Sequence, residues 1–191
     1  GPNGCGKTTI MRLINGLELA DAGTYLFDGH AVDAAYLKDS AAAQKFHQRV
    51  GFVFQNADAQ LFCATVGEEV AFGPAQMGLP ADELERRVSD AMGFFQVADL
   101  ADASPYQLSG GQQRRVAFAG VLAMEPEVLV LDEPMAGPDP AARSDFLELI
   151  DRLHRDGLTV VMVSHSMDDL ANCCDRIVVM NEGAVFAEGT P

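Results

Sequence analysis

The feature that most constrains this chain is a glycine-rich loop at its start, "GPNGCGKT". The loop matches the pattern G-x-x-x-x-G-K-[ST], in which glycines let backbone N–H groups turn inward and cradle phosphate oxygens. A helix that begins at such a loop adds the positive end of its dipole. We expect Lys7 to reach the β- and γ-phosphates and Thr8 to bind Mg²⁺ through its hydroxyl. The residues predicted to bind a nucleotide here are Asn3, Gly4, Cys5, Gly6, Lys7, Thr8 and Thr9.

A loop of this kind is normally held in place by a strand that precedes it. Gly1 is the first residue of the motif, with no strand before it. We therefore expect the sequence to be a fragment that is truncated at its N-terminus.

Strand-like and helix-like segments alternate after the loop. The apolar runs "VGFVF", "VLVL" and "TVVMV" have the length of buried strands, and "DRIVVMNEGAVFAEG" is typical of two strands around a turn. "KTTIMRLINGLELA" has helical spacing that includes Leu17, "LPADE" predicts a helix start, and a long helix is bounded by Pro140 and Gly157. This alternation predicts an α/β fold: a P-loop NTPase core with a mainly parallel sheet flanked by helices.

The middle of the chain differs from this pattern, because its periodicity is helical and amphipathic from about residue 58 to 113. We predict a core formed by residues 1–57 and 114–191, with residues 58–113 as an inserted helical subdomain.

Composition excludes several classes of protein. The formal net charge of −15 over 191 residues argues against nucleic acid as the main partner. No apolar run approaches the ~18 residues that span a bilayer, so a membrane role would have to act through a partner protein. The four cysteines have no metal-site spacing and are predicted to be reduced, which favours the cytoplasm.

Polar residues follow three of the apolar strands. Asp132 and Glu133 end "VLVLDE", where paired carboxylates by themselves are equally typical of a solvated strand end. Beside a phosphate loop, Asp132 is predicted to hold Mg²⁺ and Glu133 to act as general base on a water. His165 follows "TVVMVS" and is predicted to contact the γ-phosphate, since ligands of such sheets bind beyond the strand ends. Gln55 ends "VGFVFQ" and is a further candidate for Mg²⁺ and the attacking water.

A second glycine-rich stretch, "LSGGQ", precedes another helical run about a hundred residues later. A serine and two glycines before a helix make an anion-binding N-terminus. The order "GPNGCGKTT", "FVFQ", "LSGGQ", "VLVLDEP", "AGPDP", "VSH" resembles the ATPase subunits of ATP-binding cassette transporters. The resemblance implies that two subunits stack head to tail around two ATP molecules. It also implies residues that contact the ATP of the other subunit: Ser109, Gly110, Gly111, Gln112 and Asp139.

The stretch "FVFQNADAQLFCATVGEEVAFGPAQMGLP" is similar to the energy-coupling-factor and cobalt-type importers. That group implies a subunit on the cytoplasmic face of the cell membrane, with a transmembrane coupling protein and a separate substrate-binding membrane protein. It also implies that the helical block, especially residues 55–72, docks on a short helix of the membrane partner. The transported substrate would then be a vitamin, cobalt or nickel.

The chain departs from the family pattern at four positions: Cys5, Ala57, Met135 and Pro138. Pro138 has no backbone N–H and a fixed φ, and it stands beside Asp139, so tolerated variation and an impaired site are both open. One alternative is therefore a nucleotide-binding regulatory module without turnover. Another is an ABC-type ATPase of DNA repair or translation, which the charge and the lack of inserted arms disfavour.

Overall fold

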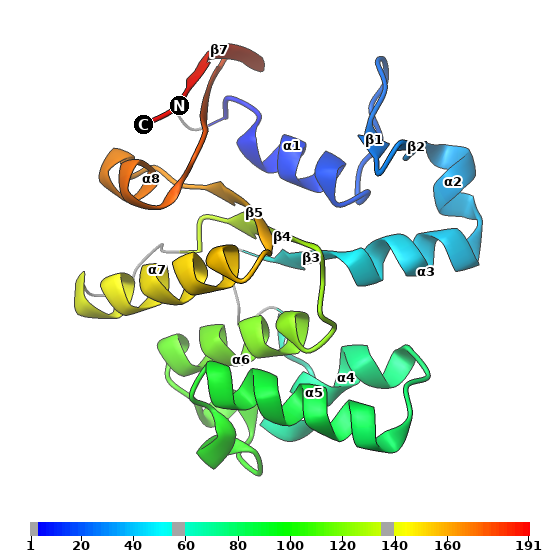
Figure 1. The fold of residues 1–191 in the computed structure, drawn as a ribbon, viewed down its shortest axis with the longest axis vertical. Helices are drawn as coiled ribbons and strands as arrows, with labels where there is room; N and C mark the ends of the chain where they lie inside the picture. The colour runs from blue at the N-terminus through cyan, green and yellow to red at the C-terminus, as the bar shows by residue number, and fades with distance from the viewer. Residues whose placement is uncertain (1–3, 55–59, 135–139) are drawn as a thin grey trace. The chain divides into compact units, whose positions relative to one another are not determined.

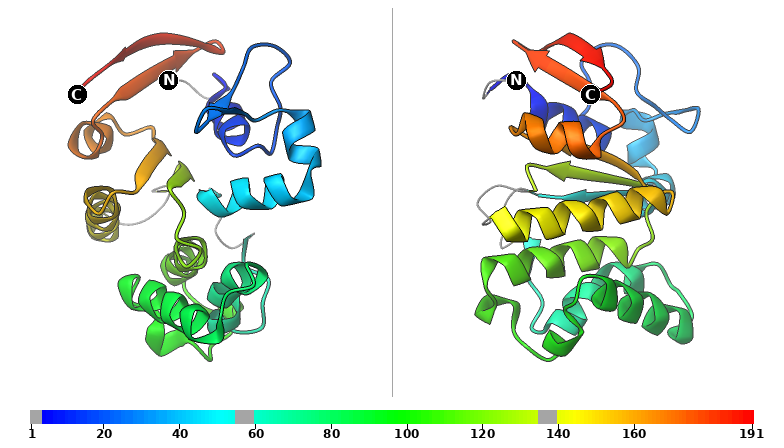
Figure 2. Two further views of the ribbon diagram at one scale, coloured as in Figure 1. Left: turned by 45° about the vertical axis from the view of Figure 1, so that its right-hand side comes forward. Right: turned by 60° about the vertical axis from the view of Figure 1, so that its left-hand side comes forward.

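The computed structural model describes residues 4–54, 60–134 and 140–191, and these residues form two compact units (Figures 1 and 2). The first unit comprises residues Gly1–His47 and Val130–Pro191, and the second comprises Gln48–Leu129. The predicted boundaries at 57/58 and 113/114 remain a prediction.

The first unit contains the phosphate loop and most of the strands. Its elements are α1 (Lys7–Ile14), β1 (Leu26–Phe27), β2 (His30–Ala31), α2 (Ala34–Lys38), most of α3 (Ser40–Arg49), the end of β4 (Val128–Asp132), α7 (Pro140–Arg155), β5 (Thr159–Val163), α8 (Met167–Cys173), β6 (Ile177–Asn181) and β7 (Ala184–Gly189). Helix α7 packs on β5 and on α8.

Three strands form a parallel sheet with the order β3-β4-β5, where β3 spans Val50–Val53. The middle strand β4 is buried along almost its whole length, which explains why its sequence is a continuous apolar run. The pairs β1-β2 and β6-β7 are antiparallel hairpins, and β6-β7 has an irregularity between Val179 and Met180. The predicted α/β fold with a mainly parallel core sheet is thus confirmed.

An aromatic cluster fills part of the core of the first unit. Phe46 on α3 is 1% exposed, and its ring lies edge-on to those of Tyr25, Phe27 and Tyr36. The Tyr25 hydroxyl donates to the Ile14 carbonyl at 2.9 Å, which satisfies a free carbonyl at the end of α1. This cluster therefore anchors the helix that carries the phosphate loop.

The second unit is a helical bundle built on α4 (Val66–Gln76), α5 (Ala81–Phe94) and α6 (Gly110–Leu122), with single turns at Ala98–Leu100 and Pro105–Gln107. All three helices pack on one another. Val70, Phe95 and Phe118 are buried between them, and the last two rings lie 5.7 Å apart. Because α6 belongs to this bundle, its first turn with the "LSGGQ" loop is held by the helical unit.

Several sequence-based expectations are confirmed by element boundaries. Helix α5 begins directly after Pro80, α7 runs from Pro140 and ends two residues before Gly157, and β6 and β7 flank the predicted turn. The expected first helix is too long, however. It ends at Ile14, because Gly16 adopts φ +68° and donates back to the Leu13 carbonyl, so Leu17 lies outside the helix and is 51% exposed.

Among the helices within residues 4–54, 60–134 and 140–191, none combines the length and the apolar composition that crossing a membrane requires.

Candidate active site

The phosphate loop ends at the start of α1. Gly6 is the N-cap of this helix and adopts φ +93°, a left-handed conformation that a residue with a Cβ rarely takes. Because Gly6 has no side chain, no side-chain hydrogen bond caps the first turn of α1. The helix therefore begins without the side-chain acceptor that usually satisfies N-terminal amides, which suits an anion in that place.

Side chains of the loop differ in exposure. Thr8 and Thr9 are exposed, whereas Cys5 is only 3% exposed and faces the protein. The Lys7 ammonium lies 3.5 Å from the Cys5 sulfur, and the Cys5 carbonyl accepts from the Gly183 amide at 3.3 Å. Cys5, one of the four departures from the pattern of the resembling family, is thus a buried neighbour of Lys7.

The carboxyl ends of β4 and β5 meet in the first unit. The Glu133 amide donates to the Val163 carbonyl at 3.1 Å, which places the residue after β4 beside the last residue of β5. Glu133 adopts φ 49°, a left-handed conformation that is strained for a residue with a side chain. Asp132, one residue earlier, is only 6% exposed.

This junction pairs two of the three predicted catalytic side chains, Glu133 and His165. A Glu133 carboxylate oxygen, Oε1, forms an ion pair with Nε2 of His165. The Glu133 side chain is 21% exposed and that of His165 is 44% exposed, so both remain accessible to solvent. A carboxylate held against an imidazole at the edge of a sheet can accept a proton from a bound water.

The second glycine-rich loop lies on the second unit, at the start of α6. Ser109 is the N-cap, and its hydroxyl oxygen accepts from the Gln112 amide at 3.3 Å and lies 3.1 Å from the Gln112 side-chain oxygen. The same Gln112 oxygen accepts from the Ser109 amide at 2.9 Å, which completes a capping box. Ser109, Gly110 and Gly111 are exposed.

Three predicted site residues lie outside the described residues: Asn3, Gln55 and Asp139. The same is true of Ala57, Met135 and Pro138. The roles predicted for Asn3, Gln55 and Asp139 remain predictions.

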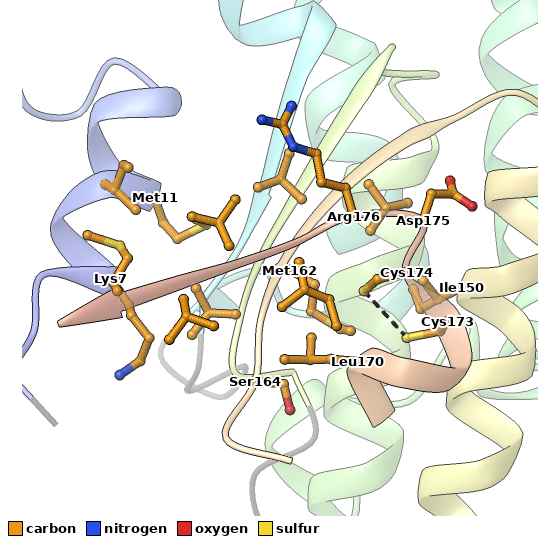
Figure 3. A pocket seen from close by; sticks show the side chains of 18 of the residues that line it. Lys7, Met11, Ile150, Met162, Ser164, Leu170, Cys173, Cys174, Asp175 and Arg176 are labelled. Carbon is orange, nitrogen blue, oxygen red and sulfur yellow. Dashed lines mark hydrogen bonds between the residues drawn. The ribbon is translucent and has the colours of Figure 1, made fainter. Parts of the chain in front are cut away.

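A cavity of about 560 Å³ lies within the first unit, next to Lys7 (Figure 3). It is bordered by α1, β5, α8 and β6, and its wall is largely apolar, with side chains such as Met11, Met162 and Leu170. This lining does not suit a triphosphate.

Two features of this region were not found from the sequence. Cys173 and Cys174 line the cavity with their sulfurs 3.9 Å apart, and the hydrogen bond between the two side chains lowers the pKa of Cys174 to about 7. Arg143 on α7 forms an ion pair with Asp169 on α8. For this ion pair, the available sequence signal was the S-x-x-D spacing of Ser166 and Asp169, which is typical of a helix start.

Comparison with known proteins identifies the family. The family model described as "ABC transporter" matches residues 1–136. The nickel import ATP-binding protein LarO of Lactiplantibacillus plantarum is 46% identical over 95% of this chain and 75% of its own length. The energy-coupling factor transporter ATP-binding protein EcfA2 of Symbiobacterium thermophilum is 50% identical over 100% of this chain and 65% of its own length.

A solved structure agrees with these matches. It is the structure of cbiO1 from Clostridium perfringens, described as part of the ABC transporter complex cbiONQ. It superposes with a TM-score of 0.89 at 39% identity and covers 100% of this chain and 74% of its own. The chain thus spans about two thirds to three quarters of these proteins. With its phosphate loop, its Glu133–His165 pair and its "LSGGQ" helix start, the chain belongs to the ATP-binding cassette (ABC) transporter family.

Proposed function

We propose that this chain is the ATP-hydrolysing subunit of a membrane importer of the vitamin or cobalt/nickel uptake type, bound to the cytoplasmic face of the membrane. The observation that carries the hydrolytic part is the ion pair between Glu133 and His165 at the adjoining ends of β4 and β5. The import part rests on the relatives, which are named for nickel import and for energy-coupling factor transport.

The phosphate loop binds the ATP of its own subunit in this proposal. Backbone amides at the start of α1 and the Lys7 ammonium contact the phosphates, and Thr8 is exposed in the first turn of the same helix. Binding here orients the nucleotide and neutralises part of its charge before reaction.

Hard oxygen ligands suited to Mg²⁺ are present in the first unit. The Thr8 hydroxyl and the buried Asp132 carboxylate are oxygen ligands of the kind that this ion prefers. Gln55, which lies outside the described residues, is the third proposed ligand. A bound Mg²⁺ would supply charge neutralisation at the β- and γ-phosphates.

Glu133 and His165 carry the proton chemistry. The Glu133 carboxylate accepts a proton from the attacking water, and His165 holds that carboxylate and stabilises charge on the γ-phosphate. The positive φ of Glu133 and the hydrogen bond from its amide to the Val163 carbonyl fix the Glu133 backbone relative to β5, the strand that precedes His165.

A second ATPase subunit, identical or a related paralogue, completes each site. The helix start at Ser109 presents a hydroxyl and exposed glycine amides, which suit the γ-phosphate of ATP bound to the partner. ATP binding closes the pair and hydrolysis reopens it.

Aromatic side chains on the second unit support docking of a membrane partner. Phe62 and Phe72 are 59% and 45% exposed, and their rings pack edge-to-face at 4.8 Å. The buried carboxylate of Glu69 accepts from the Phe62 and Cys63 amides at 2.8 and 2.7 Å, which holds this loop in shape. A preformed apolar patch is suited to the apolar side of a short helix from a transmembrane coupling protein. A separate membrane protein that binds the substrate is the third component.

The test is ATP hydrolysis by the full-length protein with and without its membrane partner. Glu133→Gln should retain ATP binding, accumulate as an ATP-bound dimer and lose about 10²- to 10⁴-fold in rate. Glu148→Gln, which changes an exposed carboxylate on α7, is the control and should hydrolyse ATP normally. Near-normal hydrolysis by Glu133→Gln would exclude Glu133 as the base. A wild-type protein that binds ATP without turnover would favour a regulatory module.

A further inference from the structure

We propose that the ion pair between Arg143 and Asp169 is a positioning pair that sets the place of His165 for hydrolysis. This inference rests on the proposed function, because it assumes that His165 takes part in ATP hydrolysis. The proposed function gives neither Arg143 nor Asp169 a contact with the nucleotide.

His165 lies in a short link between β5, which ends at Val163, and α8, which begins at Met167. Both sides of the link are tied by serine hydroxyls. The Ser166 amide donates to the Ser164 hydroxyl at 3.1 Å, and the Ser166 hydroxyl accepts from the Asp169 amide at 3.3 Å. The backbone position of His165 therefore depends on where the first turn of α8 sits.

Asp169 fixes that first turn. The residue is only 7% exposed, and a buried carboxylate needs a charged partner to offset its desolvation. Nε of Arg143 lies 3.0 Å from both carboxylate oxygens, and Nη2 binds one of them as well. The hydrogen bonds that Arg143 donates to the Asp169 carboxylate raise the pKa of Arg143, so the guanidinium stays charged at any physiological pH.

The pair joins two helices that follow the two catalytic residues along the chain. Arg143 is on α7, the first helix after Glu133, and Asp169 is on α8, the first helix after His165. The segments that follow Glu133 and His165 are thus joined twice: by the ion pair of these two residues and by the Arg143–Asp169 ion pair between α7 and α8. Loss of the link would let α8 shift, and a displacement of about 1 Å at a catalytic group costs up to ~10²-fold in rate.

Arg155 provides a matched control on the same helix. Its ion pair with Asp151, 2.6 Å long, joins two positions one turn apart on α7, and the Arg155 side chain is 75% exposed. Arg155→Gln removes the same charge as Arg143→Gln, without touching α8. Exposed pairs of this kind contribute little to stability.

The experiment compares kinetic constants in the full-length protein with its membrane partner. We expect Arg143→Gln to lower kcat by about 10- to 100-fold while the ATP Kd changes less than about 2-fold. Arg143→Lys keeps the charge and should recover part of the loss, and Arg155→Gln should match the wild type. An ATP Kd that rises in parallel with an unchanged kcat would overturn the proposal.

A double-mutant cycle separates positioning from general stabilisation. If Arg143 acts through His165, then Arg143→Gln should reduce the residual single-turnover rate of His165→Ala by less than about 2-fold. If Arg143→Gln lowers the single-turnover rate as much in His165→Ala as it does in the wild type, the Arg143–Asp169 pair does not act through His165.

The His165 ring gives a readout that does not need hydrolysis. In Arg143→Gln, or in Arg143→Lys if the first variant does not fold, the imidazole NMR resonances of His165 should move, while those in Arg155→Gln should not. Unchanged resonances in a folded Arg143 variant would overturn the inference. Normal hydrolysis by His165→Ala would instead overturn the role that the proposed function gives to His165.

Discussion

The two glycine-rich loops each precede a helix, but the two helices begin differently. Helix α1 starts at Gly6 in a left-handed conformation with no side-chain cap. Helix α6 starts at Ser109 in an extended conformation and is closed by a capping box with Gln112. The first helix start has no side-chain cap, whereas the second satisfies part of its hydrogen bonding through the side chains of Ser109 and Gln112.

This difference indicates different relations to phosphate. The start of α1 has no side-chain acceptor of its own, so we expect it to bind a phosphate tightly within one subunit. The Ser109 hydroxyl has an internal partner in Gln112, so its contact with a phosphate would compete with the capping box. We therefore expect the second loop to contribute mainly when a partner subunit brings ATP close.

The largest expected effect comes from placing one defect in each loop. Lys7→Ala alone and Ser109→Arg alone should each lower hydrolysis by about 10²-fold or more, because each removes a phosphate contact. A mixture of the two variants forms one composite site with both defects and one with neither. The mixture should regain activity in a steady-state ATPase assay, unless both sites must act together.

The control for this mixture is each variant at the same total concentration. Intact hydrolysis and dimerisation by Ser109→Arg alone would contradict the contact across subunits.

A smaller effect should separate the glycines of the two loops. Gly6→Ala forces a Cβ onto a residue at φ +93° and should lower the free energy of unfolding by about 1–2 kcal/mol. Gly110→Ala meets nothing within 4 Å in a helical first turn, so it should be neutral or stabilise by up to ~1 kcal/mol. Urea unfolding of both variants measures the difference. Equal destabilisation would mean that the two helix starts are strained alike.

The smallest effect concerns the capping box itself. Gln112→Ala removes the acceptor of the Ser109 amide and should cost about 0.5–1 kcal/mol of unfolding free energy. The neighbouring Gln113 instead donates to the Pro105 carbonyl at 3.0 Å, so Gln113→Ala tests an adjacent glutamine outside the box. If Gln112 restrains Ser109, Gln112→Ala should also change the ATP dependence of dimer formation, which light scattering can follow. No change in that dependence would separate the cap from ATP contact.

Local patterns predicted elements well where a few neighbouring residues decide the backbone. Pro80 and Pro140 mark helix starts, and the turn between β6 and β7 contains Glu182 and Gly183, both with positive φ. Leu17 shows where periodicity failed, since Gly16 ends the helix despite continued apolar spacing. Helices α2 and α3 were not predicted from the sequence, and the place of Phe46 on α3 is explained only by its ring contacts with Tyr25, Phe27 and Tyr36.

The candidate site also has features that local sequence predicted and features that it did not. Its residue types were predicted from motifs, because each motif spans fewer than about ten residues and its chemistry depends on backbone amides or adjacent side chains. The places of Gln55 and Asp139 remain predictions. The direct pairing of Glu133 with His165 could not be read from spacing, because the carboxyl ends of β4 and β5 meet only when the strands align.

The sequence by itself determined the two helix starts, since Gly6, Ser109 and Gln112 act through contacts within three residues. It also determined the buried character of β4, which follows from an unbroken apolar run. Only the tertiary structure decided that Arg143 on α7 meets a buried Asp169 on α8, 26 residues away. The physical reason is that capping and backbone conformation are local, whereas a buried charge finds its partner through the packing of distant helices.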